Sequence, residues 1–281
     1  MRIFALSDLH VDYPDNLAWV ESLSRSDYTG DALLVAGDIS HDENLLCRAM
    51  ESLRSRFRAV FFVPGNHDMW LRGSGHEHSL AKFYVLMERC RSLGVETTAQ
   101  HADEGGPYIV PLQAWYVQPH EGEGSLFVEK QGEDPHLGMW ADKRAVCWPQ
   151  FDGHPGPASF FLSLNDCAVT EDCQAPVITF SHFLPRPELM FWTEEEFAAT
   201  GLAPGDPQPR FNFSRVAGCR ELDDQIRALG STLHVYGHQH RNRDRLIDGV
   251  RYISHCLGYP REREQGRVRG VEEGPLLIWE Q

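Results

Sequence analysis

The residues of this chain that are best suited to chemistry are carboxylates, an amide and imidazoles in five short motifs. These motifs are Asp8-Leu9-His10, Gly37-Asp38, Gly65-Asn66-His67-Asp68, Ser181-His182 and Gly237-His238-Gln239-His240. Each motif follows an apolar run typical of a β-strand, so five strand ends would present side chains that bind metals. Carboxylate together with imidazole favours Mn, Fe, Zn, Ni or Co over a calcium site built from oxygen atoms alone. The pattern therefore predicts two divalent metal ions held side by side.

Two of these motifs indicate how the ions would be shared. Asp38 follows Gly37, where the missing side chain lets the backbone approach the ions, and its two carboxylate oxygens can bridge them. Asn66 offers a neutral carbonyl oxygen. The other predicted ligands are carboxylate and imidazole groups, namely Asp8, His10, His182, His238 and His240.

A pair of metal ions about 3.5–4 Å apart is suited to in-line attack at phosphorus. Such a pair lowers the pKa of a shared water and neutralises charge on the phosphoryl oxygens. His67, next to Asn66, is then placed to give a proton to the leaving oxygen. We expect hydrolysis of phosphate esters by a metal-bound hydroxide, with His67 as the general acid.

The elements that must position these residues alternate cleanly in the first part of the chain. Strands are predicted over 2–7, 32–36 and 59–63. Helices are predicted from Asp15 or Asn16, over 42–57 and over 79–93. This order implies parallel strands with right-handed crossovers, and ligands of such sheets gather beyond the carboxyl ends of the strands.

The rest of the chain is less regular. We predict short strands of a meander over 108–112 and 114–117, further strands over 177–181, 232–236 and 275–279, and helices over 158–167 and 220–229. The Asp248-Gly249 pair predicts a hairpin turn. Two long loops remain, at about 118–157 and 183–217, and the first is interpreted as a surface excursion or a lid. We expect a single domain spanning residues 1–281.

The composition narrows the classes of partner. The net charge of −15 argues against binding of extended nucleic acid, because such binding needs a basic face. It permits a small phosphorylated substrate, because bound metal cations reverse the local field. No run approaches the roughly 20 apolar residues of a membrane span, and the first apolar stretch is too short for a signal peptide. The seven cysteines show no Cys-x-x-Cys spacing, so we expect reduced thiols in a cytoplasmic protein. The oligomeric state is not predicted.

The joint pattern resembles that of the calcineurin-like metallophosphoesterases, and the match runs from Asp8 to His240 with no motif missing. The resemblance implies an α/β fold, a four-layer α/β/β/α sandwich with two mixed β-sheets flanked by helices. It also implies a dinuclear site and His67 as the catalytic histidine. Ligands of one ion would be Asp8, His10, Asp38 and His240. Ligands of the other would be Asp38, Asn66, His182 and His238.

Departures from the family pattern indicate the branch. Ser/Thr protein phosphatases carry Gly-Asp-x-Val-Asp-Arg-Gly, in which the second Asp supports the catalytic histidine, and His41 stands at that position here. Purple acid phosphatases place a tyrosine ligand at the same position. We therefore expect the small bacterial-type branch. His41 could contact substrate phosphate, a metal-bound water or His67, or it could be a partly exposed residue at a helix start. What orients His67 stays open.

Other residues are candidates for contact with substrate. Arg72 follows a site motif, and the segment Tyr259-Pro260-Arg261-Glu262-Arg263 resembles one near the site in small bacterial-type members. We expect His41, Arg72 and Arg263 to contact substrate, although a solvated loop would have the same composition. Phosphomonoesters and small-molecule phosphodiesters are rival substrates. The alternative function, an inactive scaffold for protein contacts, is disfavoured because all seven ligands and His67 are present.

Overall fold

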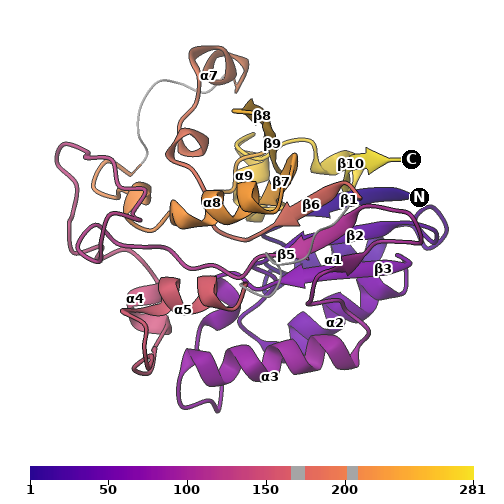
Figure 1. Cartoon of the computed structure of the whole chain (residues 1–281), viewed down its shortest axis with the longest axis horizontal. Coiled ribbons are helices and arrows are strands. Elements are labelled where there is room, and N and C mark those ends of the chain that lie inside the picture. Colours follow the sequence, from indigo (N-terminus) through magenta and orange to yellow (C-terminus); the bar gives the residue numbers. More distant parts are fainter. Residues whose placement is uncertain (166–174, 201–207) are drawn as a thin grey trace.

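Two mixed β-sheets lie face to face at the centre of the fold (Figure 1). This computed structural model describes residues 1–165, 175–200 and 208–281. The first sheet has the order β10-β1-β2-β3, with β1 (Arg2–Leu6), β2 (Ala32–Ala36), β3 (Ala59–Val63) and β10 (Leu276–Glu280). The second has the order β4-β5-β6-β7-β9-β8, with β4 (Gln100–His101), β5 (Tyr108–Pro111), β6 (Val177–Phe180), β7 (Leu233–Tyr236), β8 (Arg243–Ile247) and β9 (Val250–Ser254).

Parallel pairing dominates both sheets, and the antiparallel strands lie at their edges. Strands β1, β2 and β3 are parallel neighbours, and so are β5, β6, β7 and β9. The edge strands β10, β4 and β8 pair antiparallel with their neighbours. Because parallel strands end at the same edge of a sheet, the loops that follow β1, β2 and β3 meet there.

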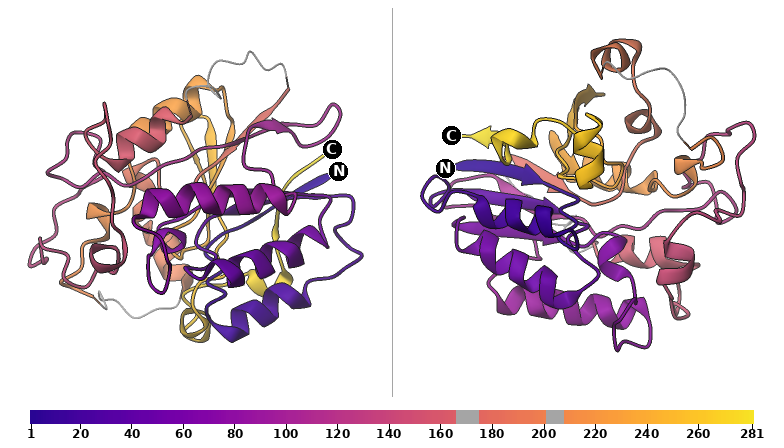
Figure 2. Two further views of the ribbon diagram at one scale, coloured as in Figure 1. Left: turned by 90° about the horizontal axis from the view of Figure 1, so that it is seen from below. Right: turned by 180° about the vertical axis from the view of Figure 1, so that it is seen from behind.

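Helices cover the outer faces of both sheets. The helices are α1 (Pro14–Ser22), α2 (Glu43–Arg54), α3 (Ser79–Ser92), α4 (Asp142–Ala145), α5 (Pro157–Ser163), α7 (Glu194–Thr200), α8 (Glu221–Ala228) and α9 (Pro260–Glu264). Short 3-10 turns occupy His67–Met69, Pro187–Met190, Phe213–Arg215 and Val271–Glu273. Figure 2 shows α1, α2 and α3 lying across one face of the first sheet. Helix α2 begins after Asp42, whose carboxylate accepts the backbone N–H groups of Asn44 and Leu45.

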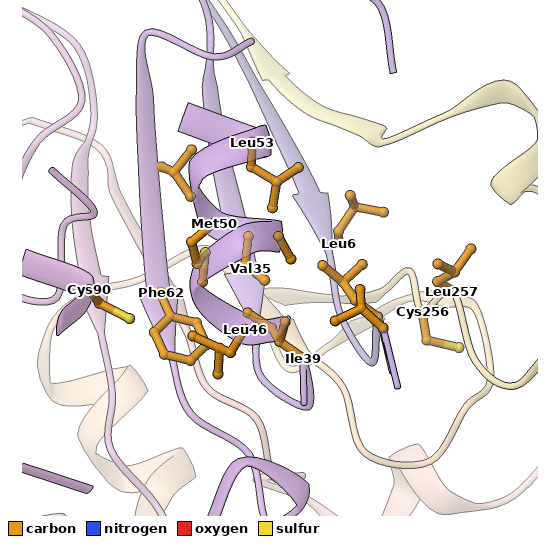
Figure 3. Close-up of a cluster of buried hydrophobic side chains, with 14 of the residues drawn as sticks. Leu6, Val35, Ile39, Leu46, Met50, Leu53, Phe62, Cys90, Cys256 and Leu257 are labelled. Atoms are coloured by element: carbon orange, nitrogen blue, oxygen red, sulfur yellow. The ribbon is translucent and has the colours of Figure 1, made fainter. Parts of the chain in front are cut away.

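The first layer of core lies between these helices and the first sheet. Leu6, Val35 and Phe62 point from the three parallel strands toward Leu46 and Met50 of α2 (Figure 3). All five side chains are fully buried. The alternate residues of the same strands face the other way, as the period of a strand requires.

Two further core layers complete the sandwich. Ile3 and Leu34 of the first sheet pack against Ile178 and Val235 of the second, so the two sheets share an apolar interface. On the far face of the second sheet, strand residues pack against Leu222 and the rest of the apolar side of α8. The predicted four-layer α/β/β/α sandwich is therefore confirmed.

Most predicted strands are confirmed, and the hairpin is as expected. Asp248 and Gly249 have φ values of 49° and 85°, and Ile247 pairs with Val250 across the turn. The predicted strand at 114–117 is wrong. This segment has irregular backbone and a hydrogen bond from Val117 N–H to Gly218 O at 3.1 Å. Strand β5 pairs parallel with β6, so no meander forms there.

The two long segments are more ordered than loops. Residues 118–157 include α4, and 183–217 include α7 and two 3-10 turns. The helix predicted over 158–167 corresponds to α5, and its last two residues lie outside the described ranges, as do 201–207 of the second segment. Within the described ranges no helix is long and apolar enough to cross a membrane. The described cysteines are free thiols, and Cys167 and Cys173 lie outside those ranges. The single domain and the cytoplasmic location stay predictions.

Candidate metal centre

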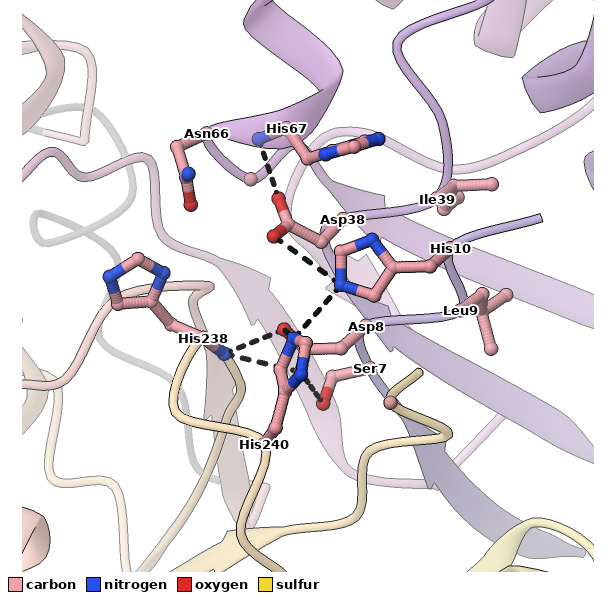
Figure 4. Close-up of polar contacts among 12 residues, drawn as sticks. Ser7, Asp8, Leu9, His10, Asp38, Ile39, Asn66, His67, His238 and His240 are labelled. Carbon is pink, nitrogen blue, oxygen red and sulfur yellow. Dashed lines mark hydrogen bonds and ion pairs between the residues drawn. The ribbon is translucent and has the colours of Figure 1, made fainter. Parts of the chain in front are cut away.

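The predicted metal ligands follow the C-terminal ends of five strands, and the structure brings them together. Figure 4 shows the side chains of Asp8, His10, Asp38 and His240 directed toward one another, with Asn66 and His238 beside them. All seven predicted ligands are buried or nearly so. Four come from the first sheet and three from the second.

The backbone at these residues is strained. Asp8, His10, Asp38, His238 and His240 have φ values of 51°, 42°, 58°, 73° and 53°. In the described part of the chain only two other non-glycine residues have positive φ. Such conformations cost on the order of 1–3 kcal/mol each and gather at functional sites. They turn the chain sharply after β1, β2 and β7, so that side chains from these turns converge.

Three glycines allow the backbone to pass close to the ligands. A Cβ atom on Gly65 would lie 2.1 Å from Asp38 Oδ1, and one on Gly37 would lie 2.6 Å from His182 Nδ1. A Cβ on Gly237 would lie 2.7 Å from an oxygen of Asp8. These positions therefore leave no room for a side chain.

The ligand atoms form two adjoining clusters. In the first, His240 Nε2 lies 2.9 Å from His10 Nε2 and 3.4 Å from Asp8 Oδ1. In the second, His182 Nε2 lies 3.2 Å from both Asn66 Oδ1 and His238 Nδ1.

Asp38 belongs to both clusters. Its Oδ2 lies 3.9 Å from His10 Nε2 and its Oδ1 lies 3.4 Å from His182 Nε2. Each carboxylate oxygen thus faces one cluster. The groups Asp8, His10, Asp38, His240 and Asp38, His182, His238 are each compact enough to hold a metal ion.

The chemistry of the cluster fits a cation. Burial lowers the pKa of both His10 and His238 well below the usual range, which favours the neutral imidazole that binds metals. Burial, with the nearby charges of Asp68 and Asp8, raises the pKa of Asp38. A cation between these groups would offset the cost of burying the ionised Asp38 carboxylate beside other carboxylates.

Outer hydrogen bonds fix which nitrogen of each imidazole faces the clusters. His182 Nδ1 donates to Ala36 O and His238 Nε2 donates to Val216 O, both at 2.9 Å. His240 Nδ1 lies 2.7 Å from Glu262 Oε2. In each ring the other nitrogen is left for the cluster, a common arrangement around bound metals.

Asp68 holds the turns rather than a metal. Its carboxylate accepts the backbone N–H groups of Asp38, Ile39, Ser40 and Gly65 at 2.8–3.0 Å. It therefore joins the turn after β2 to the turn after β3. Sequence reasoning noted only that Asp68 adjoins His67.

Asp142 of α4 brings the first long segment to the site. Its carboxylate accepts from Asn66 Nδ2 at 3.0 Å, Trp70 Nε1 at 2.6 Å and the Tyr116 hydroxyl at 3.2 Å. Because the Asn66 amide nitrogen faces Asp142, its oxygen faces His182. Sequence reasoning missed Asp142, since nothing in its local sequence marks it.

His67 lies beside the clusters in the 3-10 turn after Asn66. Its backbone N–H donates to Asp38 Oδ1 at 2.8 Å (Figure 4). The ring of Trp70 lies 4.0 Å from the His67 ring, centroid to centroid. The Arg72 guanidinium lies 4.5 Å from the Trp70 ring, so Trp70 contacts both Arg72 and His67.

Arg263 has other partners. Its guanidinium donates to Leu257 O at 2.9 Å, to Gly258 O at 3.1 Å and to Asn16 Oδ1 at 2.8 Å. These contacts fasten the loop after β9 to α1, and the structure does not place Arg263 among the ligands. A contact between Arg263 and substrate stays a prediction.

Comparisons with known proteins identify a family and similar proteins. The sequence model of the calcineurin-like phosphoesterase family matches residues 1–242. The acyl-carrier-protein phosphodiesterase PptH of Mycobacterium tuberculosis is 28% identical over 279 residues, covering 92% of this chain and 78% of that protein. The crystal structure of the phosphopantetheinyl hydrolase PptH from Mycobacterium tuberculosis superposes with a TM-score of 0.75. It is 22% identical, and the match covers 100% of this chain and 96% of that one.

Proposed function

Because the chain belongs to the calcineurin-like phosphoesterase family, we propose that it hydrolyses phosphodiesters at a dinuclear metal centre. It is a hydrolase of a metal-dependent family, and the residues able to hold metal are described above. The proposed ligands are Asp8, His10, Asp38, Asn66, His182, His238 and His240. The observation that carries the proposal is the carboxylate of Asp38, which turns one oxygen to each cluster.

The protein's own groups have distinct tasks in this proposal. Two bound ions would supply a nucleophilic hydroxide and neutralise charge on the phosphoryl oxygens. His67 gives a proton to the leaving oxygen, and its hydrogen bond to Asp38 holds it beside the centre. Nδ1 of the half-buried His41 lies 3.4 Å from Nε2 of His67, and the Arg72 guanidinium packs on the Trp70 ring that contacts His67. We propose that Arg72 faces the outer part of the substrate.

The relative in Mycobacterium tuberculosis suggests the substrate. Its name describes a phosphodiesterase of acyl carrier protein, and the similar solved structure is called a phosphopantetheinyl hydrolase. We propose that this chain also acts on a phosphopantetheinyl diester carried by a protein, instead of a small free diester. A phosphomonoester is the rival substrate.

The test compares metals and substrates in parallel. Purified protein loaded with Mn, Fe, Zn, Ni or Mg is assayed on phosphopantetheinylated carrier protein, bis-p-nitrophenyl phosphate and p-nitrophenyl phosphate. We expect turnover of the carrier protein and preference for the diester over the monoester. Preference for the monoester would contradict the proposed substrate class. No turnover with any metal, despite bound ions, would favour the inactive scaffold.

Two variants test the assigned roles. Asp38→Ala should lose metal from both clusters, measured by elemental analysis, while the exposed Asp152→Ala is the control. Full activity in Asp38→Ala would contradict the bridging role. His67→Ala should keep its metals and lower kcat by roughly 10²–10⁴-fold, with a smaller loss for good leaving groups.

A further inference from the structure

We propose that Asp12 is the residue that positions His67 for proton transfer, an inference that rests on the proposed role of His67 as general acid. Asp12 lies in the loop between β1 and α1, two residues after His10. Its Oδ2 lies 2.8 Å from Nε2 of His67. No motif in the sequence marks this pair, because 55 positions separate the two residues.

The carboxylate of Asp12 is itself held from its other side. Its Oδ1 lies 2.7 Å from His41 Nδ1 and accepts the Ser40 hydroxyl at 2.8 Å. The Ser40 oxygen in turn accepts the backbone N–H of Asp42 at 3.0 Å. The loop after β1 is therefore tied to the start of α2, and Asp12 has little freedom to turn away from His67.

Burial strengthens this contact. The side chains of Asp12 and His67 are 17% and 8% exposed, so water competes weakly for their hydrogen bond. A carboxylate that accepts from one nitrogen of an imidazole fixes the orientation and tautomer of the ring. The ring of Trp70 packs on His67 and limits its movement further.

The contact also decides which nitrogen of His67 carries the transferable proton. Since Nε2 faces Asp12, the acid must be Nδ1, which is buried and makes no hydrogen bond within the described part of the chain. As the P–O bond breaks, its electron pair stays on the leaving oxygen and the Nδ1 proton moves there. His67 is then neutral and regains a proton from water.

The structure also assigns a role to His41. Its Nδ1 faces the Asp12 carboxylate and lies 3.4 Å from His67 Nε2. His41 therefore supports the Asp12–His67 pair and acts on the reaction through it. A competing interpretation makes Asp12 a metal ligand, because His10, Asp12 and His67 are also close enough together to hold an ion.

The test uses Asp12→Asn in the full-length protein, with the exposed neighbour Asp15→Asn as the matched control. Rates are measured on a series of phosphodiesters with leaving groups from p-nitrophenol to alkyl alcohols. We expect Asp12→Asn to slow alkyl leaving groups by roughly 10–100-fold. It should slow p-nitrophenyl substrates far less, and its metal content should equal that of wild type.

A second arm separates positioning from other roles. In the His67→Ala background, Asp12→Asn should cause no further loss, because residues that act as a unit are not additive. In metal-free protein labelled with ¹⁵N-histidine, the Nε2-bound proton of His67 should give a sharp downfield signal that Asp12→Asn removes. Asp12→Glu, which keeps the carboxylate, should restore part of the rate and the wild-type dependence on leaving group.

Several outcomes would overturn the proposal. Loss of metal in Asp12→Asn would make Asp12 a ligand. Equal slowing of all leaving groups, or a further loss in the His67→Ala background, would show that Asp12 acts independently of His67. If Asp12→Asn does not fold, an Asp12→Glu variant with unchanged stability that slows all leaving groups equally would contradict it. A wild-type rate in His67→Ala would instead refute the proposed general acid, whatever the Asp12 variants do.

Discussion

Gly65 shows how little space separates the backbone from the proposed ligands. A Cβ there would lie 2.1 Å from Asp38 Oδ1 and 2.7 Å from the ring of His182. We expect Gly65→Ala to push both side chains out of place and to lower metal affinity by roughly tenfold or more. The metal affinity is measured by isothermal titration calorimetry.

Gly75 provides the matched control for this change. A Cβ on Gly75 would meet no described atom within 4 Å, so Gly75→Ala should leave the affinity unchanged. Wild-type affinity in Gly65→Ala would show that the turn after β3 can move without disturbing the cluster.

Glu262 holds the ring of His240 in place. Its Oε2 lies 2.7 Å from His240 Nδ1 and accepts the Tyr259 backbone N–H at 2.8 Å. We expect Glu262→Gln to weaken metal binding by roughly 10–100-fold, as loss of such outer partners does elsewhere. The exposed Glu264→Gln is the control. Unchanged affinity for Mn²⁺ in Glu262→Gln would remove this role.

Among single residues, the sequence predicts a functional role only where the adjacent residues in the chain form a recognisable motif. The proposed ligands stand in short motifs after apolar strands, so a local reading finds them. Asp12 and Asp142 stand in no such motif, and they contact partners 55 and 76 positions away. Glu262 lies in the segment 259–263, which was singled out for its arginines, and its contact with His240 spans 22 positions. Only the folded chain places these carboxylates, because their function lies in a tertiary contact.

At the scale of elements, the two long segments are joined by an ion pair. Arg215 donates to both carboxylate oxygens of Glu133 at 2.9 and 2.7 Å, and its guanidinium lies 4.6 Å from the Phe127 ring. The hydrogen bond from Arg215 lowers the pKa of Glu133 below its usual value. The pair therefore stabilises the protein above the ordinary carboxyl pKa, and this stabilisation is lost as pH falls through the lowered pKa.

Glu133→Gln tests this link. At pH 7 the variant should unfold at a slightly lower temperature than wild type, by an amount corresponding to about 1 kcal/mol or less. The difference should shrink as the pH falls below the lowered pKa of Glu133, where the wild-type side chain is protonated too. The exposed Glu129→Gln should match wild type throughout. A difference that grows in acid would contradict the pair's contribution.

The elements that could be predicted are those whose apolar residues recur with a regular spacing. Helix α2 has its buried residues on one face and an Asp42 cap, and the buried strands are apolar throughout. The segment 114–117 has the composition of a strand, but Trp115 packs into an aromatic cluster and the backbone joins no sheet. Short α9 and two-residue β4 were missed because they contain too few residues to show a period.

At the scale of the whole molecule, the proposed centre links the two sheets. Asp8, His10, Asp38 and Asn66 follow strands of the first sheet, whereas the three remaining histidines follow strands of the second. Metal bound there stabilises only the folded state. At a free concentration 100 times the Kd, the gain is about 2.7 kcal/mol.

Metal removal is therefore expected to lower the melting temperature. We predict a fall of several degrees when a chelator replaces saturating Mn²⁺, measured by differential scanning fluorimetry. Asp38→Ala, which lacks the bridge, should melt at the same temperature in both buffers. An equal shift in that variant would trace the effect to metal bound elsewhere.

The spread of the proposed ligands along the chain has a consequence during synthesis. They run from residue 8 to residue 240, and β10, the partner of β1, comes only at Leu276–Glu280. A ribosome must therefore synthesise the chain beyond Glu280 before both clusters and this edge of the first sheet can close. Both ions could be held only after His240 has been synthesised, so a shorter nascent chain would lack ligands of both clusters.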